Sequence, residues 1–110
     1  MFFKPPKETK EIRWTRHIKE KMKQYQLSEK RLIRIFKNPE RKEEGVAPRT
    51  IAVMERAGTK KHPYEIWLMY QKKPKKTIMI SAWKYPGKSP VRKPPIPEEV
   101  LENLEEIIKN

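Results

Sequence analysis

Three strand-like segments in close succession constrain the fold more than any other feature of this sequence. Residues 49–57, 64–72 and 77–85 are rich in β-branched, aromatic and Met side chains, which favour strands. The connections 58–63 and 73–76 have hairpin length and contain Gly or Pro, residues that tight turns use. The sequence therefore predicts a meander of antiparallel strands.

The middle segment carries apolar side chains on both faces of this predicted sheet. Ile66, Leu68 and Tyr70 alternate with Trp67 and Met69. Neighbouring residues of a strand point to opposite faces, so apolar residues at odd and even positions indicate a strand that is buried on both sides. We therefore expect other parts of the chain to cover much of both faces.

A short strand and two helices are expected before the meander. Residues 12–14 alternate between apolar and charged side chains, which predicts a short first strand. Thr15 is a suitable N-cap for an amphipathic helix, and Ser28 for a second helix that ends at Asn38-Pro39. These two helices are the natural cover for one face of the sheet.

The end of the chain has a different composition. Residues 86–97 contain five prolines and three basic residues, which predicts an extended, semi-rigid tether. Residues 98–110 begin with two glutamates, which suit a helix start, and carry one apolar stripe. We expect an acidic helix there that docks on the same domain.

These elements predict an α+β domain. Its N-terminal helices pack on an antiparallel sheet of three to four strands within residues 11–85, and the C-terminal helix follows on the proline-rich tether. A chain of 110 residues is long enough for one modest core and too short for two. We expect residues 1–10 to be a flexible N-terminus and residues 40–48 to be a charged loop.

The charge points to a polyanionic partner. Lys and Arg number 27 against 14 Asp and Glu, a formal net charge of +13. Residues 49–97 carry +10, whereas residues 98–110 carry −4. Such an excess favours binding to an anionic partner, and we expect RNA in particular, although composition alone also allows an anionic membrane surface or an acidic protein.

The sequence also argues against several other classes of protein. Cysteine is absent and only two histidines are present, so disulfides, thiol nucleophiles and thiolate zinc sites are excluded, and we expect neither a metal nor another cofactor. No apolar run approaches the length of a membrane-spanning helix, and the first residues lack the pattern of a signal peptide. We therefore expect a cytoplasmic protein with no membrane partner.

One string of residues resembles a known family. In order, it comprises His17, Lys21-Met22, Tyr25, Gln26-Leu27-Ser28, Asn38-Pro39-Glu40 and, later, Ile80-Ser81-Ala82. Over about residues 12–85 the chain resembles an uncharacterised toxin-like family related to BrnT and to the RelE/ParE toxin superfamily. The resemblance implies a RelE/BrnT-like α+β fold. Lys21 and Tyr25 stand where that family usually has Arg.

The resemblance directs attention to candidate catalytic residues. His17 lies in the matched position, where a near-neutral pKa suits acid–base transfer during attack of a ribose 2′-hydroxyl on phosphate. RelE-like nucleases use basic and tyrosine side chains on the sheet, which implies Arg49, Arg56, Lys84 and Tyr85 as a second candidate set. The alternatives are a capping histidine and side chains that merely solvate a sheet edge.

Clustered cations with interleaved aromatic residues are typical of nucleic-acid binding. We expect the cations to form a continuous positive field over the sheet and its hairpin tips, with rings available to stack on unpaired bases. The alternatives are solvated loops and rings in the core. The candidate binding residues are Lys21, Lys60, Lys61, Lys72, Lys73, Lys75, Lys76, Trp83, Lys88, Arg92 and Lys93.

The leading hypothesis is a toxin-like RNA-binding protein that acts on free or ribosome-bound RNA and is a candidate metal-independent endoribonuclease, with an acidic antitoxin as partner. One alternative is a non-catalytic RNA- or ribosome-binding accessory domain, which the replaced arginines favour. Another is a basic protein-interaction module. The acidic C-terminal helix raises the further hypothesis that it folds over the basic face and masks it.

Overall fold

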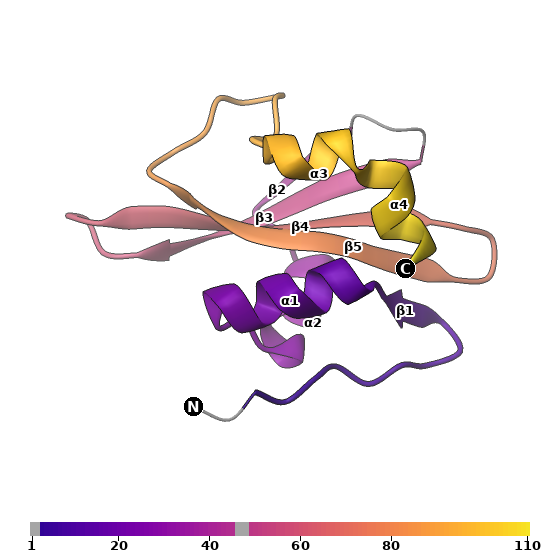
Figure 1. The fold of residues 1–110 in the computed structure, drawn as a ribbon. Coiled ribbons are helices and arrows are strands. Elements are labelled where there is room, and N and C mark those ends of the chain that lie inside the picture. Colours follow the sequence, from indigo (N-terminus) through magenta and orange to yellow (C-terminus); the bar gives the residue numbers. More distant parts are fainter. Residues whose placement is uncertain (1–2, 46–48) are drawn as a thin grey trace.

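A five-stranded sheet lies between two layers of helices (Figure 1). The computed structural model describes residues 3–45 and 49–110. The strands are β1 (Ile12–Trp14), β2 (Arg41–Glu44), β3 (Thr50–Gly58), β4 (Pro63–Lys72) and β5 (Thr77–Pro86), in the spatial order β1-β5-β4-β3-β2. The helices are α1 (Arg16–Tyr25), α2 (Glu29–Lys37), α3 (Glu98–Glu102) and α4 (Leu104–Lys109).

The predicted meander is confirmed, but the sheet is larger than predicted and is mixed. Strands β2 to β5 pair antiparallel in chain order, whereas β1 pairs parallel with β5. The prediction of an antiparallel sheet with three to four strands was therefore wrong in number and in direction. The additional strand is β2, which lies in the expected loop 40–48 and pairs with residues 51–54 of β3. Residues 46–48 of that loop lie outside the described residues.

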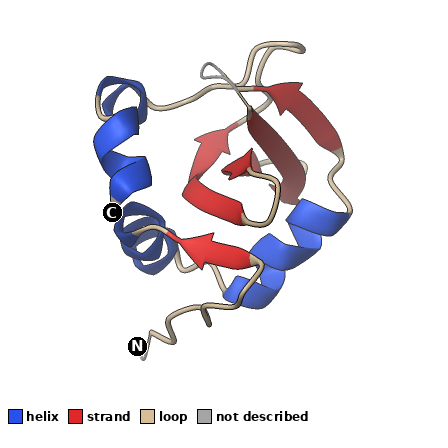
Figure 2. Ribbon diagram, turned by 90° about the vertical axis from the view of Figure 1, so that its right-hand side faces the viewer, coloured by secondary structure: helices blue, strands red, loops and turns tan. Residues whose placement is uncertain are grey.

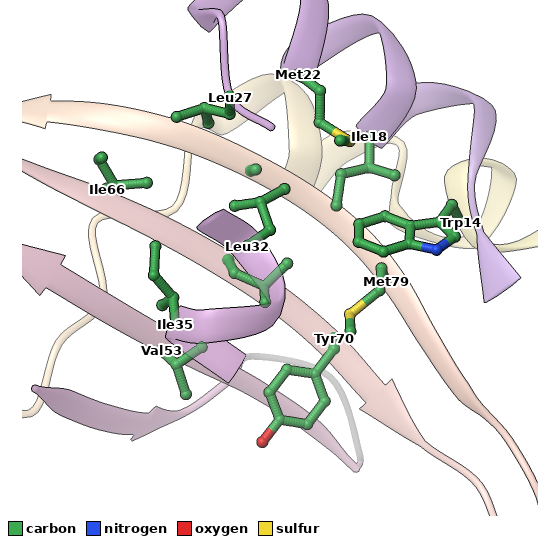
Figure 3. Packing of buried hydrophobic residues seen from close by; sticks show 12 residues of the cluster. Trp14, Ile18, Met22, Leu27, Leu32, Ile35, Val53, Ile66, Tyr70 and Met79 are labelled. Atoms are coloured by element: carbon green, nitrogen blue, oxygen red, sulfur yellow. The ribbon is translucent and has the colours of Figure 1, made fainter. Parts of the chain in front are cut away.

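Helices α1 and α2 form the layer below the sheet in Figure 1. Each begins at its predicted cap: the side-chain oxygens of Thr15 and Ser28 accept hydrogen bonds from the backbone N–H of Ile18 and Arg31. Figure 3 shows the core that results, in which Ile18, Met22, Leu32 and Ile35 from the helices pack on side chains of the sheet. Figure 2 shows the twisted sheet nearly end-on, with helices on both sides of it.

A β-bulge joins α1 to the sheet. Met69 pairs with Ser81 and Tyr70 pairs with Met79, so Ile80 is an extra residue in β5. The Ile80 carbonyl accepts a hydrogen bond from Oγ1 of Thr15 at 2.7 Å, and the backbone N–H of Thr15 donates to the Met79 carbonyl. The residue that caps α1 therefore also fixes the start of this helix against the bulge.

Helices α3 and α4 form the layer on the other face. The prediction of a single helix over residues 98–110 was wrong. The helix is interrupted at Asn103, which separates α3, of five residues, from α4, of six residues. Val100 and Ile107 are buried against side chains that include Trp67 and Trp83. Both faces of the sheet are therefore covered, as the apolar pattern of β4 predicts.

The segment expected as a tether is held against the sheet by a buried polar cluster. We call Arg41, Glu65, Trp67 and Ser89 the clasp. The Glu65 carboxylate is only 1% exposed and accepts hydrogen bonds from Trp67 Nε1, Ser89 N and Ser89 Oγ at 2.9, 3.0 and 2.6 Å. Arg41 lies over the Trp67 ring and donates to the carbonyls of Ser89 and Pro90. Burial raises the pKa of Glu65, but the bonds from Ser89 and Trp67, with the charge of Arg41, lower it below its ordinary value overall.

The N-terminal segment has no regular secondary structure over residues 3–10 and lies against α1 and α2. Phe3 packs on the core beneath these helices, and the backbone N–H of Lys7 donates to the Glu29 side chain. The Glu8 carboxylate accepts a hydrogen bond from the backbone N–H of Trp14 at 2.9 Å. These contacts place the segment expected as a flexible terminus on the domain, and residues 1–2 lie outside the described residues.

Candidate nucleic-acid interface

The exposed cations of the sheet gather at its two ends. The β3–β4 turn lies at one end of β4 and the β4–β5 turn at the other, on the left and right of Figure 1. We call Arg56, Lys60, Lys61, Lys84 and Lys88 the first basic end. We call Arg49, Lys72, Lys73, Lys75 and Lys76 the second basic end.

The first basic end is built on a tight turn between β3 and β4. Gly58 has φ +85°, and a Cβ atom on it would lie 2.3 Å from the His62 carbonyl oxygen, so the turn requires glycine. The Thr59 backbone N–H donates to His62 O and the His62 N–H to Thr59 Oγ1, which leaves the side chains of Lys60 and Lys61 exposed. The sequence thus forms a rigid tip with both lysines pointing into solvent.

The end of β5 brings more cations to this first basic end. The backbone N–H of Gly87 donates to the Pro63 carbonyl at 2.8 Å, which places Lys88 near the start of β4. Lys84 Nζ lies 5.1 Å from the ring centroid of half-buried Tyr64, a cation–π contact. Residues 56–64 and 84–88 contain no Asp or Glu.

The second basic end is the β4–β5 turn together with the residue before β3. Two backbone hydrogen bonds between Lys73 and Lys76 close the turn. The Lys72 N–H donates to the Arg49 carbonyl at 3.3 Å, and Arg49 has a positive φ of 66°. Four cations within residues 72–76, with Arg49 beside them, give this end the same number of positive side chains as the other.

Carboxylates leave these ten cations uncompensated. Within residues 3–45 and 49–110, no ion pair joins a carboxylate to a cation of either basic end. Several carboxylates are engaged elsewhere: Glu55 with Arg31 and Arg34, Glu43 with Arg41, and Glu99 with Lys21. The ten cations at the ends of the sheet therefore keep their charge unpaired in the folded chain.

The expected continuous field over the sheet is not formed, because helices cover both faces and the basic ends lie apart. Trp83 was expected to stack on bases, but its side chain is 2% exposed and stacks on Trp67, with centroids 6.2 Å apart. Lys21 is 14% exposed and pairs with Glu99 at 2.5 Å. Arg92 and Lys93 are exposed on the segment that follows the clasp.

His17 lies on α1 beside β5. Its Nε2 is 2.9 Å from Oγ of buried Ser81, next to the bulge. Burial, and secondarily the charge of Lys21, lowers the pKa of His17 below 6.5 despite the opposing effects of Glu99 and Glu20. His17 is thus half-buried and bonded to a buried hydroxyl, an arrangement that fits the capping or core-edge role, the alternative to catalysis.

The four candidate catalytic residues on the sheet do not lie together at one site. Arg49 belongs to the second basic end, whereas the other three lie at the first. Lys84 and Tyr85 are neighbours in β5 and therefore point to opposite faces. Arg56 and Tyr85 do share a cross-strand row, but Glu65 occupies the position between them. No set of the proposed catalytic residues surrounds a common point where phosphate could react.

The two helical layers carry opposite charge. Helices α1 and α2 contain eight Lys or Arg and two Glu, whereas α3 and α4 contain five Glu and one Lys. A polyanion is therefore attracted to the α1–α2 side of the sheet and repelled from the α3–α4 side. The acidic helices lie on the face opposite α1 and α2, with Glu99 reaching Lys21 at the edge between the layers.

Sequence reasoning missed the exposed cations of α2. Lys30, Arg34 and Lys37 are exposed and recur at intervals of four and three, which places them on one helical face. That interval was available in the sequence and could have revealed this face. The clasp was also missed: Glu65 is an isolated carboxylate before an apolar strand, which signals a buried charge in need of partners, but nothing local identifies Arg41 or Ser89.

Two further observations bear on the class of protein. Within the described part of the chain, no group of three or more His, Cys, Asp or Glu side chains is placed to hold a metal ion. No described helix combines the length and apolar character needed to cross a bilayer. Comparisons with protein-family models, with curated proteins and with solved structures find no match to this chain.

Proposed function

We propose that this protein binds RNA through its phosphates and does not cleave it. The observation that supports this proposal is the set of ten cations at the two basic ends, none of which pairs with a carboxylate among the described residues. Unpaired lysines release condensed counterions when they meet phosphates, which is the main source of sequence-independent affinity. The resemblance to BrnT and RelE/ParE toxins makes RNA the first polyanion to test.

Binding without cleavage fits the placement of the candidate catalytic residues better than nuclease activity does. His17 is bonded to a buried hydroxyl, and Lys84 and Tyr85 lie on opposite faces of β5. Phosphate-binding lysines, in contrast, need only exposure and charge. Exposed cations that can hold RNA are thus present, whereas the residues expected to carry out in-line attack on a phosphodiester do not lie together.

Fluorescence anisotropy with labelled RNA at several salt concentrations tests the proposal. We expect the logarithm of the binding constant to fall linearly with the logarithm of the salt concentration. The magnitude of this salt slope should decrease by about 1 for each phosphate-binding lysine removed. The variant Lys60→Gln/Lys61→Gln removes two exposed cations of the first basic end, and Lys73→Gln/Lys75→Gln removes two of the second.

The matched control is Lys93→Gln/Lys109→Gln, which removes the same charge from exposed positions on the α3–α4 side, away from both basic ends. This control should change the salt slope of RNA binding less than either of the two variants at the basic ends does. Equal slopes for all three variants would contradict the assignment to the basic ends, and no binding at low salt would contradict RNA binding itself. Incubation of labelled RNA with the protein in EDTA should leave the RNA intact, and cleavage that is lost in His17→Ala would restore the nuclease hypothesis.

A further inference from the structure

The distance between the two basic ends is fixed by the sheet. Strand β4 runs from the first end at Pro63 to the second at Lys72 without interruption and pairs with β3 and β5 along its length. At about 3.3 Å per residue this strand spans roughly 30 Å. The longest dimension of the molecule is 40 Å. The two groups of five cations therefore lie at opposite ends of a rigid support.

The aromatic side chains do not offer a stacking platform. All three tryptophans and Tyr70 are buried, and the other aromatic residues in the described part of the chain are partly buried, so none of them is exposed. Proteins that prefer single strands typically combine a positive groove with rings on which unpaired bases stack. Double-stranded RNA, in contrast, is recognised mainly by shape and by its phosphates and 2′-hydroxyls.

The distance between the basic ends and the burial of the aromatic rings both favour double-stranded RNA as the ligand. On the basis of the RNA binding proposed above, we infer that the two basic ends together hold one double-stranded RNA at two points about one helical turn apart. An A-form duplex presents the same face once in every helical turn, a repeat comparable with the separation of the ends. It is also stiff, so holding it at two distant points costs little conformational entropy, whereas a single strand has to be kept extended.

The charge of the helical layers gives the duplex a side to approach from. The α3–α4 layer carries net −4 and repels phosphate, whereas α1 and α2 carry net +6 and lie between the two ends on the other face (Figure 1). Lys30, Arg34 and Lys37 of α2 are exposed there and add cations to the same side.

Duplex length is the variable that tests this inference. A duplex of about 8 base pairs is shorter than one turn and can engage one end at a time, whereas one of about 20 base pairs can engage both. When the second contact becomes intramolecular, affinity gains a factor set by effective concentration. We expect the 20-base-pair duplex to bind at least about tenfold more tightly than the 8-base-pair duplex. It should also bind more tightly than oligouridine of the same length.

The end variants provide the decisive comparison. Lys60→Gln/Lys61→Gln and Lys73→Gln/Lys75→Gln should each remove most of the gain of the longer duplex, whereas Lys93→Gln/Lys109→Gln should keep it. Circular dichroism and thermal unfolding of each variant establish that it is folded. Equal affinity for duplex and oligouridine, or a length dependence that survives in both end variants, overturns this inference and leaves RNA binding standing. Failure to bind any RNA overturns the proposed function instead.

Discussion

The two helical layers cover the same sheet but are held in different ways. Helices α1 and α2 have ten and nine residues, side-chain N-caps and four fully buried apolar residues between them. Helices α3 and α4 have five and six residues, no side-chain cap and two buried residues. The first layer is specified by local sequence signals, whereas the second depends on contacts from elsewhere, above all on the clasp.

The same substitution in each layer should have unequal effects. Ile35→Ala empties a fully buried site under α2 and should lower the free energy of unfolding by about 3–5 kcal/mol. Ile107→Ala, in the short helix α4, should cost about 2 kcal/mol, because that layer can relax around the lost volume. Urea denaturation measures both values, and equal costs would mean that the two layers are equally integrated with the sheet.

Substitutions of the polar links to the two layers should differ in the opposite direction. Glu65→Ala leaves Trp67 Nε1 and the Ser89 N–H buried without their acceptor and should cost about 2–3 kcal/mol. Glu55→Ala breaks the more exposed ion pairs with α2 and should cost less than about 1 kcal/mol. A larger loss for Glu55→Ala in urea denaturation would show that the clasp does not secure the second layer.

Substitutions at the starts of α2 and α4 test the same difference between the two layers, with smaller expected changes in stability. Ser28→Ala removes the bond to the Arg31 N–H and should destabilise the protein by about 1 kcal/mol. Asn103→Ala, at the start of α4, removes no N-capping bond and only the exposed bond from Asn103 Nδ2 to the Glu99 carbonyl, and it should change stability by less than about 0.5 kcal/mol. Thermal melts of both variants are sufficient to test this difference, which a similar loss in Asn103→Ala would contradict.

The smallest expected effect is a pH dependence from His17. Because the pKa of His17 is lower in the folded protein than its ordinary 6.5, the unfolded chain takes up this proton more readily. Stability should therefore decrease as the pH falls from 7 towards 5. The loss from Glu65 and Glu99, whose folded pKa values are lowered, begins only below their ordinary 4.5.

Unfolding midpoints measured across pH 5–7 test the assignment to His17. The variant His17→Gln cannot take up the proton and should weaken the dependence in this range. Its midpoint at pH 7 should stay close to that of the unchanged protein, because Gln can still hydrogen-bond to Ser81. An unchanged pH profile in His17→Gln would assign the dependence to another group.

Local signals account for the parts of the fold that the sequence predicts. The caps Thr15 and Ser28 and the stop at Asn38-Pro39 place α1 and α2, because each acts within one helical turn. Strand β2 could not be predicted, since Arg41 to Glu44 have no apolar alternation. They become a strand by pairing with β3, and Arg41 and Glu43 are satisfied by residues 48 or 49 positions away.

The exposure of cations in the two turns could be predicted from the sequence. The covering of the sheet by segments that are distant in the sequence could not. Lys60, Lys61, Lys73 and Lys75 of the two turns are exposed as expected, because hairpin tips project from a sheet. Lys84 and Tyr85 could have been separated from sequence alone, since neighbours in a strand point to opposite faces. The separation of the two basic ends follows from β4, which runs between them, whereas the burial of Trp83 follows only from the packing of α3 and α4.

The stacked Trp67 and Trp83 give the molecule an internal optical reporter. Their rings are nearly parallel, at 6°, and the buried Trp83 indole N–H has no hydrogen-bond partner among the residues that the structure describes. Lifting α3 and α4 would admit water to that N–H group and shift the fluorescence emission of the pair to the red. Departure of the acidic layer could thus be followed without a label, in a chain whose only other tryptophan, Trp14, lies in the opposite core.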